Sequence, residues 1–170
     1  MISYKEALAL IANEANFQSS RRVDRNEALG LIAAADVVAQ LDVPSFDNSA
    51  MDGYAFNSAD VQQSGSTILK ITGSAFAGNP LTGSVQKGAC IRIMTGAAVP
   101  AGVDTVIAQE RVSANTDSIT FTDTIKPGMN VRLAGEDLSI GQIVLKQGHL
   151  MRAADLEIGR ASCRERVSSP

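Results

Sequence analysis

The segment from Asp47 to Ala55 gathers two carboxylates, an amide, a hydroxyl and a glycine within nine residues. It reads Asp-Asn-Ser-Ala-Met-Asp-Gly-Tyr-Ala and contains no basic residue that would balance Asp47 and Asp52. This composition favours a loop that presents oxygen atoms, which suit a hard cation such as Mg²⁺ or the hydroxyl and amine groups of a polar ligand. The alternative is an Asx turn, in which Asp47 and Asn48 bond nearby backbone N–H groups and Gly53 takes a positive φ.

A second segment, Ile93 to Gly102, reads as a strand that runs into a tight loop of small residues. Small side chains let a ligand approach the backbone, and exposed N–H groups can hold an anion. Thr95 places a hydroxyl at the end of the expected strand, and Gly96 follows it. The alternative is a plain strand exit and a Pro-Ala-Gly turn. The segment is not a phosphate-binding P-loop, because no Gly-Lys-Ser/Thr ending is present.

A third segment, Arg132 to Asp137, combines one arginine, a glycine and two acids. Arg132 could hold a phosphate or another oxyanion through two parallel hydrogen bonds. Glu136 and Asp137 add oxygens of the kind that bind metals. The alternative is an exposed ion pair on a turn, which contributes little to stability. For the similar pair Glu110-Arg111 we prefer that plainer interpretation.

Other chemistry has little support in the 170 residues. His149 is the only histidine, so a histidine-based metal site is out of reach. No Gly-x-Ser-x-Gly motif and no dinucleotide fingerprint are present. Cys90 lies in an apolar strand pattern and is expected to be a small core residue. The net charge of -3 argues against a nucleic-acid partner. No apolar run reaches transmembrane length, so we expect no membrane partner. The two cysteines, Cys90 and Cys163, do not resemble a disulfide framework, so we expect a reducing, cytoplasmic location.

The segments that could position these residues are short. Ser3 and Glu6 form a capping box before a helix expected over residues 4–15. A turn over residues 26–29 stops at Gly30, and residues 31–38 are compatible with helix or strand. Ser58 is expected to cap a helical turn over residues 59–62. Strands are expected at residues 68–71, 89–94, 105–108, 119–121 and 143–145.

The C-terminal residues differ in character from the rest. The stretch from Glu157 to Val167 resembles the translation of a common DNA-sequencing adapter. We therefore expect residues 157–170 to be a non-native tail, to be set aside before the fold is considered. The alternative is a genuine basic helix terminus.

Taken together, several motifs resemble the N-terminal region of the molybdopterin molybdenumtransferases, the MoeA family, whose eukaryotic counterpart is the gephyrin E-domain. The resemblance extends over most of residues 1–156. It rests on motifs in the same order as in the family: Leu41 to Pro44 with Asp47 to Ala55, Phe76 to Gly78, Cys90 to Pro100, Asp104 to Glu110, and Arg132 to Asp137.

The resemblance implies an enzyme that inserts molybdate into adenylylated molybdopterin with Mg²⁺ and releases AMP. Asp52, Thr95 and Asp137 fall on family positions implicated in activity, and Arg132 falls on an arginine near the same cleft. Asp52 and Asp137 are then candidate Mg²⁺ ligands, while Arg132, Gly96 and Ser49 are candidate contacts for the anionic substrate. The family protein is a homodimer, so the implied partners are adenylylated molybdopterin, molybdate and a second copy.

The resemblance also implies an α+β fold in which a β-rich domain, residues 43–142, is inserted into a small, discontinuous, helix-containing domain. That second domain would comprise residues 1–42 and 143–156, with the crossings near Pro44 and Gly141. The family continues with pterin-binding and C-terminal domains that this sequence lacks, so we expect the piece alone to be inactive. The competing interpretations are a protein-interaction scaffold of the gephyrin type and a metal-free domain for an unrelated polar ligand.

Overall fold

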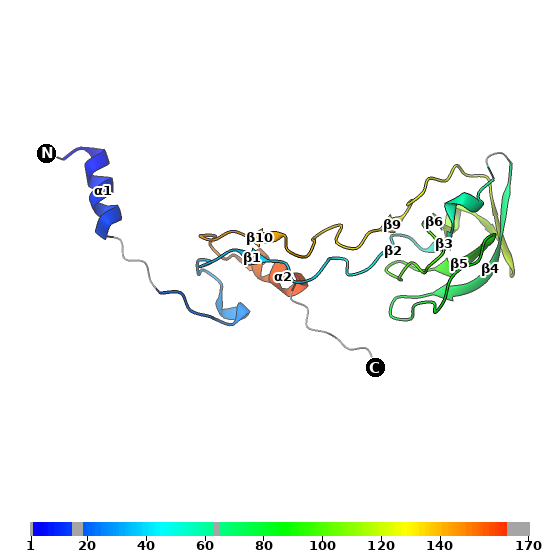
Figure 1. Ribbon diagram of the computed structural model, residues 1–170, viewed down its shortest axis with the longest axis horizontal. Coiled ribbons are helices and arrows are strands. Elements are labelled where there is room, and N and C mark those ends of the chain that lie inside the picture. The colour runs from blue at the N-terminus through cyan, green and yellow to red at the C-terminus, as the bar shows by residue number, and fades with distance from the viewer. Residues whose placement is uncertain (1, 15–18, 63–64, 163–170) are drawn as a thin grey trace.

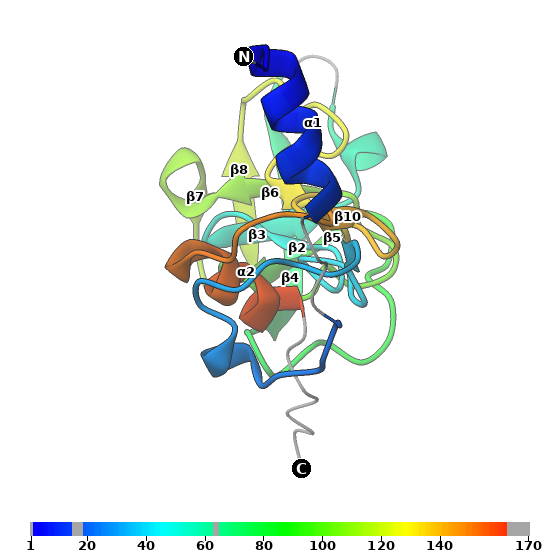
Figure 2. The same cartoon turned by 90° about the vertical axis from the view of Figure 1, so that its left-hand side faces the viewer.

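The computed structural model describes residues 2–14, 19–62 and 65–162. Helix α1 (Tyr4–Glu14) lies at one end, a narrow two-stranded ribbon occupies the middle and a six-stranded sheet lies at the other end (Figure 1). In the view along this long axis, the three parts lie one in front of another (Figure 2). The fold is α+β, as expected. None of the helices among the described residues is long and apolar enough to cross a membrane.

Helix α1 begins with the predicted capping box. The backbone N–H of Ser3 donates to Glu6 Oε2 at 2.7 Å, and the N–H of Glu6 donates to Ser3 Oγ at 3.3 Å. This reciprocal pair satisfies two N–H groups that a helix start leaves without intrahelical partners. None of the residues of α1 is buried, and the helix lies apart from the ribbon and the sheet (Figure 1). Ala15, the predicted last residue, lies outside the described residues.

The ribbon, defined here as residues 30–43 and 138–151, joins two segments that are far apart in the sequence. Strand β1 (Val37–Val38) pairs antiparallel with β10 (Ile143–Leu145), and Ile32 forms an isolated bridge with Leu150. Residues 31–38 are therefore extended rather than helical, and β10 matches its prediction. The pairing brings the segments on both sides of the β-rich part together. The domain boundaries at residues 42 and 143 stay a prediction.

Short helical elements flank the ribbon. A 3₁₀ turn, η1 (Arg25–Glu27), is capped by Asp24 and precedes Gly30, whose φ is +77°. Helix α2 (Ala153–Ser162) follows the ribbon and contacts η1. Helix α2 thus extends past residue 157, where the non-native tail was expected to begin. Residues 163–170 of that predicted tail lie outside the described residues.

The sheet has the strand order β6-β3-β5-β4-β8-β7. Its strands are β3 (Gly53–Phe56), β4 (Thr67–Ala75), β5 (Ala89–Ile93), β6 (Thr105–Ala108), β7 (Ser113–Ala114) and β8 (Ser118–Phe121). All neighbours are antiparallel except β4 and β5, which are parallel. The predicted strand at residues 105–108 is confirmed, and the one expected at residues 68–71 is longer, from residue 67 to residue 75.

The three adjacent strands β6, β3 and β5 are buried on both faces, except at Arg92 of β5, which is exposed. Along β3, Ala55 packs into one apolar cluster with Ile91, whereas Tyr54 and Phe56 pack into a second cluster with Cys90. Strands covered on both sides read as continuous apolar runs instead of alternating ones. Cys90 is a buried core residue, as expected, and this burial raises the pKa of its thiol to about 12.

The predicted helical turn after β3 is a 3₁₀ turn, η2 (Ser58–Asp60), whose cap was assigned to the wrong residue. Asn57 Oδ1 accepts the N–H of Ala59 at 2.9 Å and caps the turn. The Ser58 hydroxyl instead donates to Asp104 Oδ2 at 2.7 Å, and the Ser58 N–H donates to Asp104 Oδ1. Ser58 therefore fastens the turn to the segment before β6.

Candidate active site

Asp52 and Thr95 are in direct contact at one end of the sheet. Asp52 precedes β3, Thr95 follows β5, and Gly53 lies opposite Ile93 in the antiparallel register. Asp52 Oδ1 accepts the Thr95 hydroxyl at 2.6 Å and the Thr95 backbone N–H at 2.8 Å. Two of the three segments singled out in the sequence thus meet, although 43 residues separate the bonded groups.

The contacts of Asp52 favour its ionised form. The hydrogen bond from the Thr95 hydroxyl lowers the pKa of Asp52 most, the Thr95 N–H adds to the effect, and the positive charge of Arg92 contributes a smaller part. The backbone carbonyl of Asp52 accepts the N–H of Gln109 at 3.0 Å. No residue in the described part of the chain hydrogen-bonds to Asp52 Oδ2. Asp52 is consequently a fixed carboxylate with one oxygen that remains available to a ligand.

The backbone of Gly53 explains how Asp52 is held so close to β6. Gly53 was expected to take a positive φ if the segment formed an Asx turn, but it lies in strand β3 and is not among the residues with positive φ. A Cβ at this position would collide with the carbonyl oxygen of Ile107 on β6. Glycine is required because the two strands approach closely. The Asx-turn interpretation is wrong, and so is the expectation that the whole segment is a loop.

Ser49 and Gly96 hold the two segments together beneath the Asp52–Thr95 contact. The Ser49 carbonyl accepts the Gly96 N–H at 2.8 Å, and the Ser49 N–H donates to the carbonyl of Ala97. The Ser49 side chain is buried, and its hydroxyl donates to the Met51 carbonyl at 2.6 Å. Gly96 is exposed and has a φ of +78°. Contacts of Ser49 and Gly96 with a substrate stay a prediction.

Arg132 and Asp137 form a second cluster. Arg132 Nη2 donates to both carboxylate oxygens of Asp137 at 2.6 Å, and Arg132 Nε lies 3.6 Å from Glu136 Oε1. Both acids raise the pKa of Arg132, with Asp137 the larger cause. This geometry is the exposed ion pair considered as the plainer interpretation, and Asp137 does not contact Asp52 or Thr95. The roles of Arg132 and Asp137 in catalysis remain predictions.

Strand β2 (Asn48–Ser49) lies between the two clusters. On one side it pairs antiparallel with β9 (Val131–Arg132), where Asn48 lies opposite Arg132. On the other side Asn48 forms a bridge with Ala98. Asp47 Oδ1 also accepts the N–H of Ala134 at 2.8 Å, a contact across the fold rather than a local turn. The three chemically distinctive segments are therefore side by side, joined through β2.

The donor set fits Mg²⁺ only in part. Among the described residues, no group of three or more histidine, cysteine, aspartate or glutamate side chains is placed to hold a metal. Proteins commonly bind Mg²⁺ through one or two carboxylates, with waters and substrate phosphates completing the shell. Asp52 Oδ2 is compatible with that arrangement, whereas both oxygens of Asp137 already accept hydrogen bonds from Arg132.

Arg92 was not singled out in the sequence, although it belongs to this end of the sheet. It lies on β5 opposite Tyr54 of β3, next to the Gly53–Ile93 pair. Its guanidinium carbon is 5.9 Å from the centroid of the Tyr54 ring, and Nη2 donates to Gln109 Oε1 at 3.1 Å. The available signal was a lone charged residue inside the apolar run from Ala89 to Met94.

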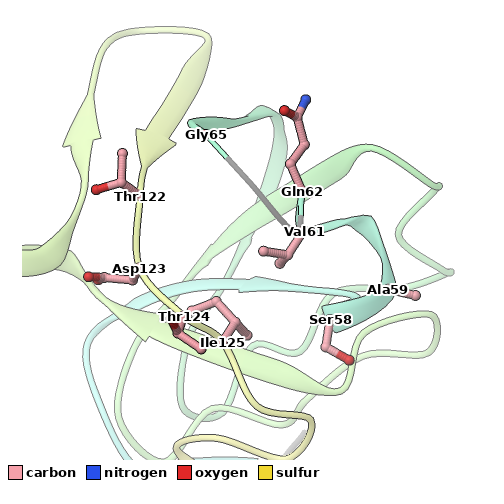
Figure 3. A pocket seen from close by; sticks show the side chains of 9 residues that line it. All are labelled: Ser58, Ala59, Val61, Gln62, Gly65, Thr122, Asp123, Thr124 and Ile125. Carbon is pink, nitrogen blue, oxygen red and sulfur yellow. The ribbon is translucent and has the colours of Figure 1, made fainter.

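A pocket of about 440 Å³ lies elsewhere, between η2 and residues 122–125 (Figure 3). Its lining includes Ser58, Asp123 and Thr124, and none of the predicted site residues. The Asp123 carboxylate is 2.9 Å from Arg111 Nε, which replaces the expected Glu110-Arg111 pair. Because Arg111 balances the only charge among the described residues of its lining, the pocket offers no argument for a second functional site.

The chain is similar over nearly its whole length to solved proteins of molybdopterin biosynthesis. A crystal structure of the molybdopterin biosynthesis MoeA protein from Pyrococcus horikoshii matches with a TM-score of 0.87 and 33% identity, over 95% of this chain and 44% of that chain. A second crystal structure, also described as a molybdopterin biosynthesis MoeA protein from Pyrococcus horikoshii, matches with a TM-score of 0.85 and 28% identity, over 95% of this chain and 42% of that chain. Fold and sequence together place this chain in the same structural class as these two proteins.

Curated sequences and a family model identify the family. The molybdopterin molybdenumtransferase of Haemophilus influenzae is 46% identical over 133 residues, which are 78% of this chain and 32% of that protein. Molybdopterin molybdenumtransferase 2 of Mycobacterium tuberculosis is 37% identical over 144 residues, 82% of this chain and 35% of that protein. The model for the MoeA N-terminal region (domain I and II) matches residues 2–162, so the chain belongs to the MoeA family. It spans about a third of the length of these curated relatives.

Proposed function

We propose that this chain contributes one wall of the active site of a molybdopterin molybdenumtransferase in molybdenum cofactor biosynthesis. The proposed reaction inserts molybdate into adenylylated molybdopterin and releases AMP. The observation that supports it most directly is the contact of Asp52 with Thr95, which unites two motifs of the family at one end of the sheet. On its own the chain is proposed to be inactive, because about two thirds of the length of each relative lies outside the part that matches this chain.

The contacts of Asp52 agree with this chemistry. Both molybdate and the pyrophosphate of the substrate are anions, so a carboxylate needs a cation between itself and them. We propose that Asp52 is the residue of this chain that would hold Mg²⁺, which would supply positive charge beside the phosphate that departs with AMP. Thr95 fixes the Asp52 carboxylate and keeps its pKa low, so that Asp52 is ionised at neutral pH.

Asp137 is proposed to act chiefly through Arg132. The carboxylate holds the guanidinium at 2.6 Å and so fixes the orientation of its planar fork. Arg132 presents that fork beside β2, next to the segment that carries Asp52. In this scheme Arg132 remains the proposed clamp on an oxyanion, and Asp137 positions it instead of binding Mg²⁺ directly.

The exposed apolar side chains of the ribbon support the proposed homodimer. Eight large apolar residues of the ribbon are exposed to solvent: Leu31, Ile32, Val37, Val38, Leu41, Ile140, Ile143 and Leu150. Apolar surface gathered on so thin an element is typical of an interface.

A protein that uses adenylylated molybdopterin and molybdate is proposed to work in the cytoplasm.

A chimera tests the enzymatic proposal. This chain replaces the matching N-terminal third of the Haemophilus influenzae relative, and the chimera is expressed in a strain that lacks the transferase. We expect it to restore molybdenum cofactor synthesis, and Asp52→Asn and Thr95→Val to lower molybdate insertion at least about 100-fold. Asp117→Asn, on the hairpin between β7 and β8, is the matched control and should keep full activity.

The scaffold alternative predicts a different result from the same chimera. The exposed ribbon is the observation that favours it, since apolar surface can serve a protein partner without any chemistry. A folded chimera that never restores cofactor synthesis, or one that restores it equally well with Asp52→Asn, would contradict the enzymatic role of this site. Calorimetry with Mg²⁺ then separates a metal-free domain from a metal-dependent one.

A further inference from the structure

Arg92 forms no salt bridge within the described residues, although its positive charge acts on the Asp52 carboxylate without a direct ion pair. Its side chain is exposed, and it takes part in none of the ion pairs found there. The cations of the neighbouring segments differ in this respect. Arg132 is paired with Asp137 and Glu136, and Arg111 is paired with Asp123. Among the described residues, Arg92 is therefore the arginine at this end of the sheet that forms no salt bridge.

The position of Arg92 is fixed from two sides without loss of its charge. The Tyr54 ring lies 5.9 Å from the guanidinium carbon, a distance at which an aromatic face attracts a cation. The Gln109 side chain accepts from Nη2 at 3.1 Å, while its amide nitrogen donates to Glu110 Oε1 at 3.4 Å. A neutral acceptor orients the guanidinium and leaves its other N–H groups available to a ligand.

Backbone contacts tie this arrangement to Asp52 and Thr95. The Gln109 N–H donates to the Asp52 carbonyl at 3.0 Å, so the residue that holds Arg92 also holds the backbone of Asp52. Arg92 lies on β5, three residues before Thr95, and its partner Tyr54 lies on β3, two residues after Asp52. An acidic group and an unpaired basic group thus share one end of the sheet.

We propose that Arg92 is a substrate-binding residue of this site and that its guanidinium holds a tetrahedral oxyanion, with Tyr54 and Gln109 as positioning residues. The inference rests on the proposed function and adds an anion contact to it. An arginine with free N–H groups suits a phosphate or molybdate, because its planar fork matches two oxygens of such an anion. Arg132 is less suited on its own, since Asp137 already occupies its Nη2.

The test measures anion affinity in the chimera with the Haemophilus influenzae relative. Isothermal titration is carried out separately with AMP in the presence of Mg²⁺ and with sodium molybdate. We expect Arg92→Gln to weaken the binding of at least one anion roughly tenfold or more, and Arg92→Lys to give an intermediate loss. Arg22→Gln, which removes the same charge outside the sheet, is the matched control and should change neither affinity more than twofold.

Gln109→Glu provides an independent variant that keeps Arg92 in place. The new carboxylate would lie where the Gln109 amide oxygen accepts from Arg92, and would pair with it. If Arg92 only supports the fold, the added ion pair should offset the repulsion between the new carboxylate and Glu110, and anion affinity should stay unchanged. If Arg92 binds the anion, affinity should fall roughly tenfold while the unfolding temperature stays the same or rises. Gln86→Glu, an added charge outside this end of the sheet, is its control.

Each outcome bears on the inference in a defined way. Loss confined to AMP assigns the contact to a phosphate, and loss confined to molybdate assigns it to the metal oxyanion. Affinities for both anions within twofold of the unmodified chimera in Arg92→Gln and Gln109→Glu would overturn the inference, as would an unmodified chimera that binds neither anion. The proposed function would still stand in those cases if the chimera restored cofactor synthesis in a manner that depends on Asp52.

Discussion

The sheet and the ribbon differ most in where their apolar side chains lie. In the sheet, Phe56, Ile91 and Ile107 are completely buried, and they belong to two clusters on opposite faces. In the ribbon, Ile32 is 66% exposed and Ile143 is 47% exposed. A similar content of aliphatic residues thus produces a core in one region and an uncovered surface in the other. The buried clusters of the sheet stabilise it from within, whereas the exposed apolar side chains of the ribbon are suited to an interface with another protein surface.

The candidate site lies in the sheet, the region with a buried core. Asp52, Thr95 and Arg92 are held at the ends or on the outer positions of strands whose neighbours are fully buried. Rigid strands hold side chains more accurately than a mobile loop does, which favours a site that must bind an anion in a fixed geometry. The ribbon holds its strands together mainly by backbone hydrogen bonds and supplies no comparable core.

The largest contrast is expected between two glycines, one in each region. Gly53→Ala places a Cβ against the Ile107 carbonyl between central strands, and should destabilise the chain by on the order of 4 kcal/mol or more. Gly141→Ala in the ribbon has open space around the added atom but a φ of +84°, which should cost about 1 kcal/mol. Urea unfolding followed by circular dichroism measures both. Similar losses in the two variants would contradict the division between the regions.

Truncation of isoleucine should give the next largest difference. Ile107→Ala leaves a cavity in a buried cluster and should lower the free energy of unfolding by about 2–5 kcal/mol. Ile143→Ala removes atoms that are already half exposed, so a change within about 0.5 kcal/mol is expected. Chemical denaturation of the monomeric chain provides both values. A loss of several kcal/mol from Ile143→Ala would mean that the ribbon has a core of its own.

Local features of the fold were accessible from the sequence because they depend on near neighbours. The capping box of Ser3 and Glu6 and the strand at residues 105–108 needed only spacing and residue type. Strand β3 was missed, since Gly53 and the polar residues before it suggest a loop. Only the approach of Ile107 on another strand shows why glycine is there.

The candidate site was likewise predictable where it depends on residue type and not where it depends on contacts between distant segments. Residue types were enough to select Asp52, Thr95 and Arg132, but the pairing of Asp52 with Thr95 depended on a contact between distant segments. Thr95 meets Asp52 only because β3 and β5 pair in one particular register. Arg92 was overlooked because the feature that distinguishes it is the lack of a salt bridge among the described residues, which a sequence does not reveal. Asp137 was grouped with Asp52, whereas the fold pairs it with Arg132.

An acid-dependent difference is expected from Thr95→Val in the sheet. The Thr95 hydroxyl is the main reason that the pKa of Asp52 is lowered, so its removal should raise that pKa toward the usual value. A carboxylate with a lowered folded-state pKa adds stability above its unfolded pKa of about 3.8, and this contribution is lost as the pH falls through the lower folded value. Carbon-detected NMR titration of the Asp52 carboxyl reports the change. An unchanged Asp52 pKa in Thr95→Val would show that the contact is not formed in solution.

The smallest effect on global stability is expected from His149→Phe, where the ribbon leads into α2. His149 Nε2 lies 2.8 Å from Asp155 Oδ2, and this hydrogen bond is the main reason that the pKa of Asp155 is lowered. Its loss should raise the Asp155 pKa, while the Arg152 N–H remains bonded to the same oxygen. The stabilisation concerned is again present above the unfolded pKa and lost on acidification. Because no buried cluster of the sheet includes these residues, faster amide exchange should be confined to α2 and its surroundings. Faster exchange in β3 and β5 as well would show that the two regions unfold as one unit.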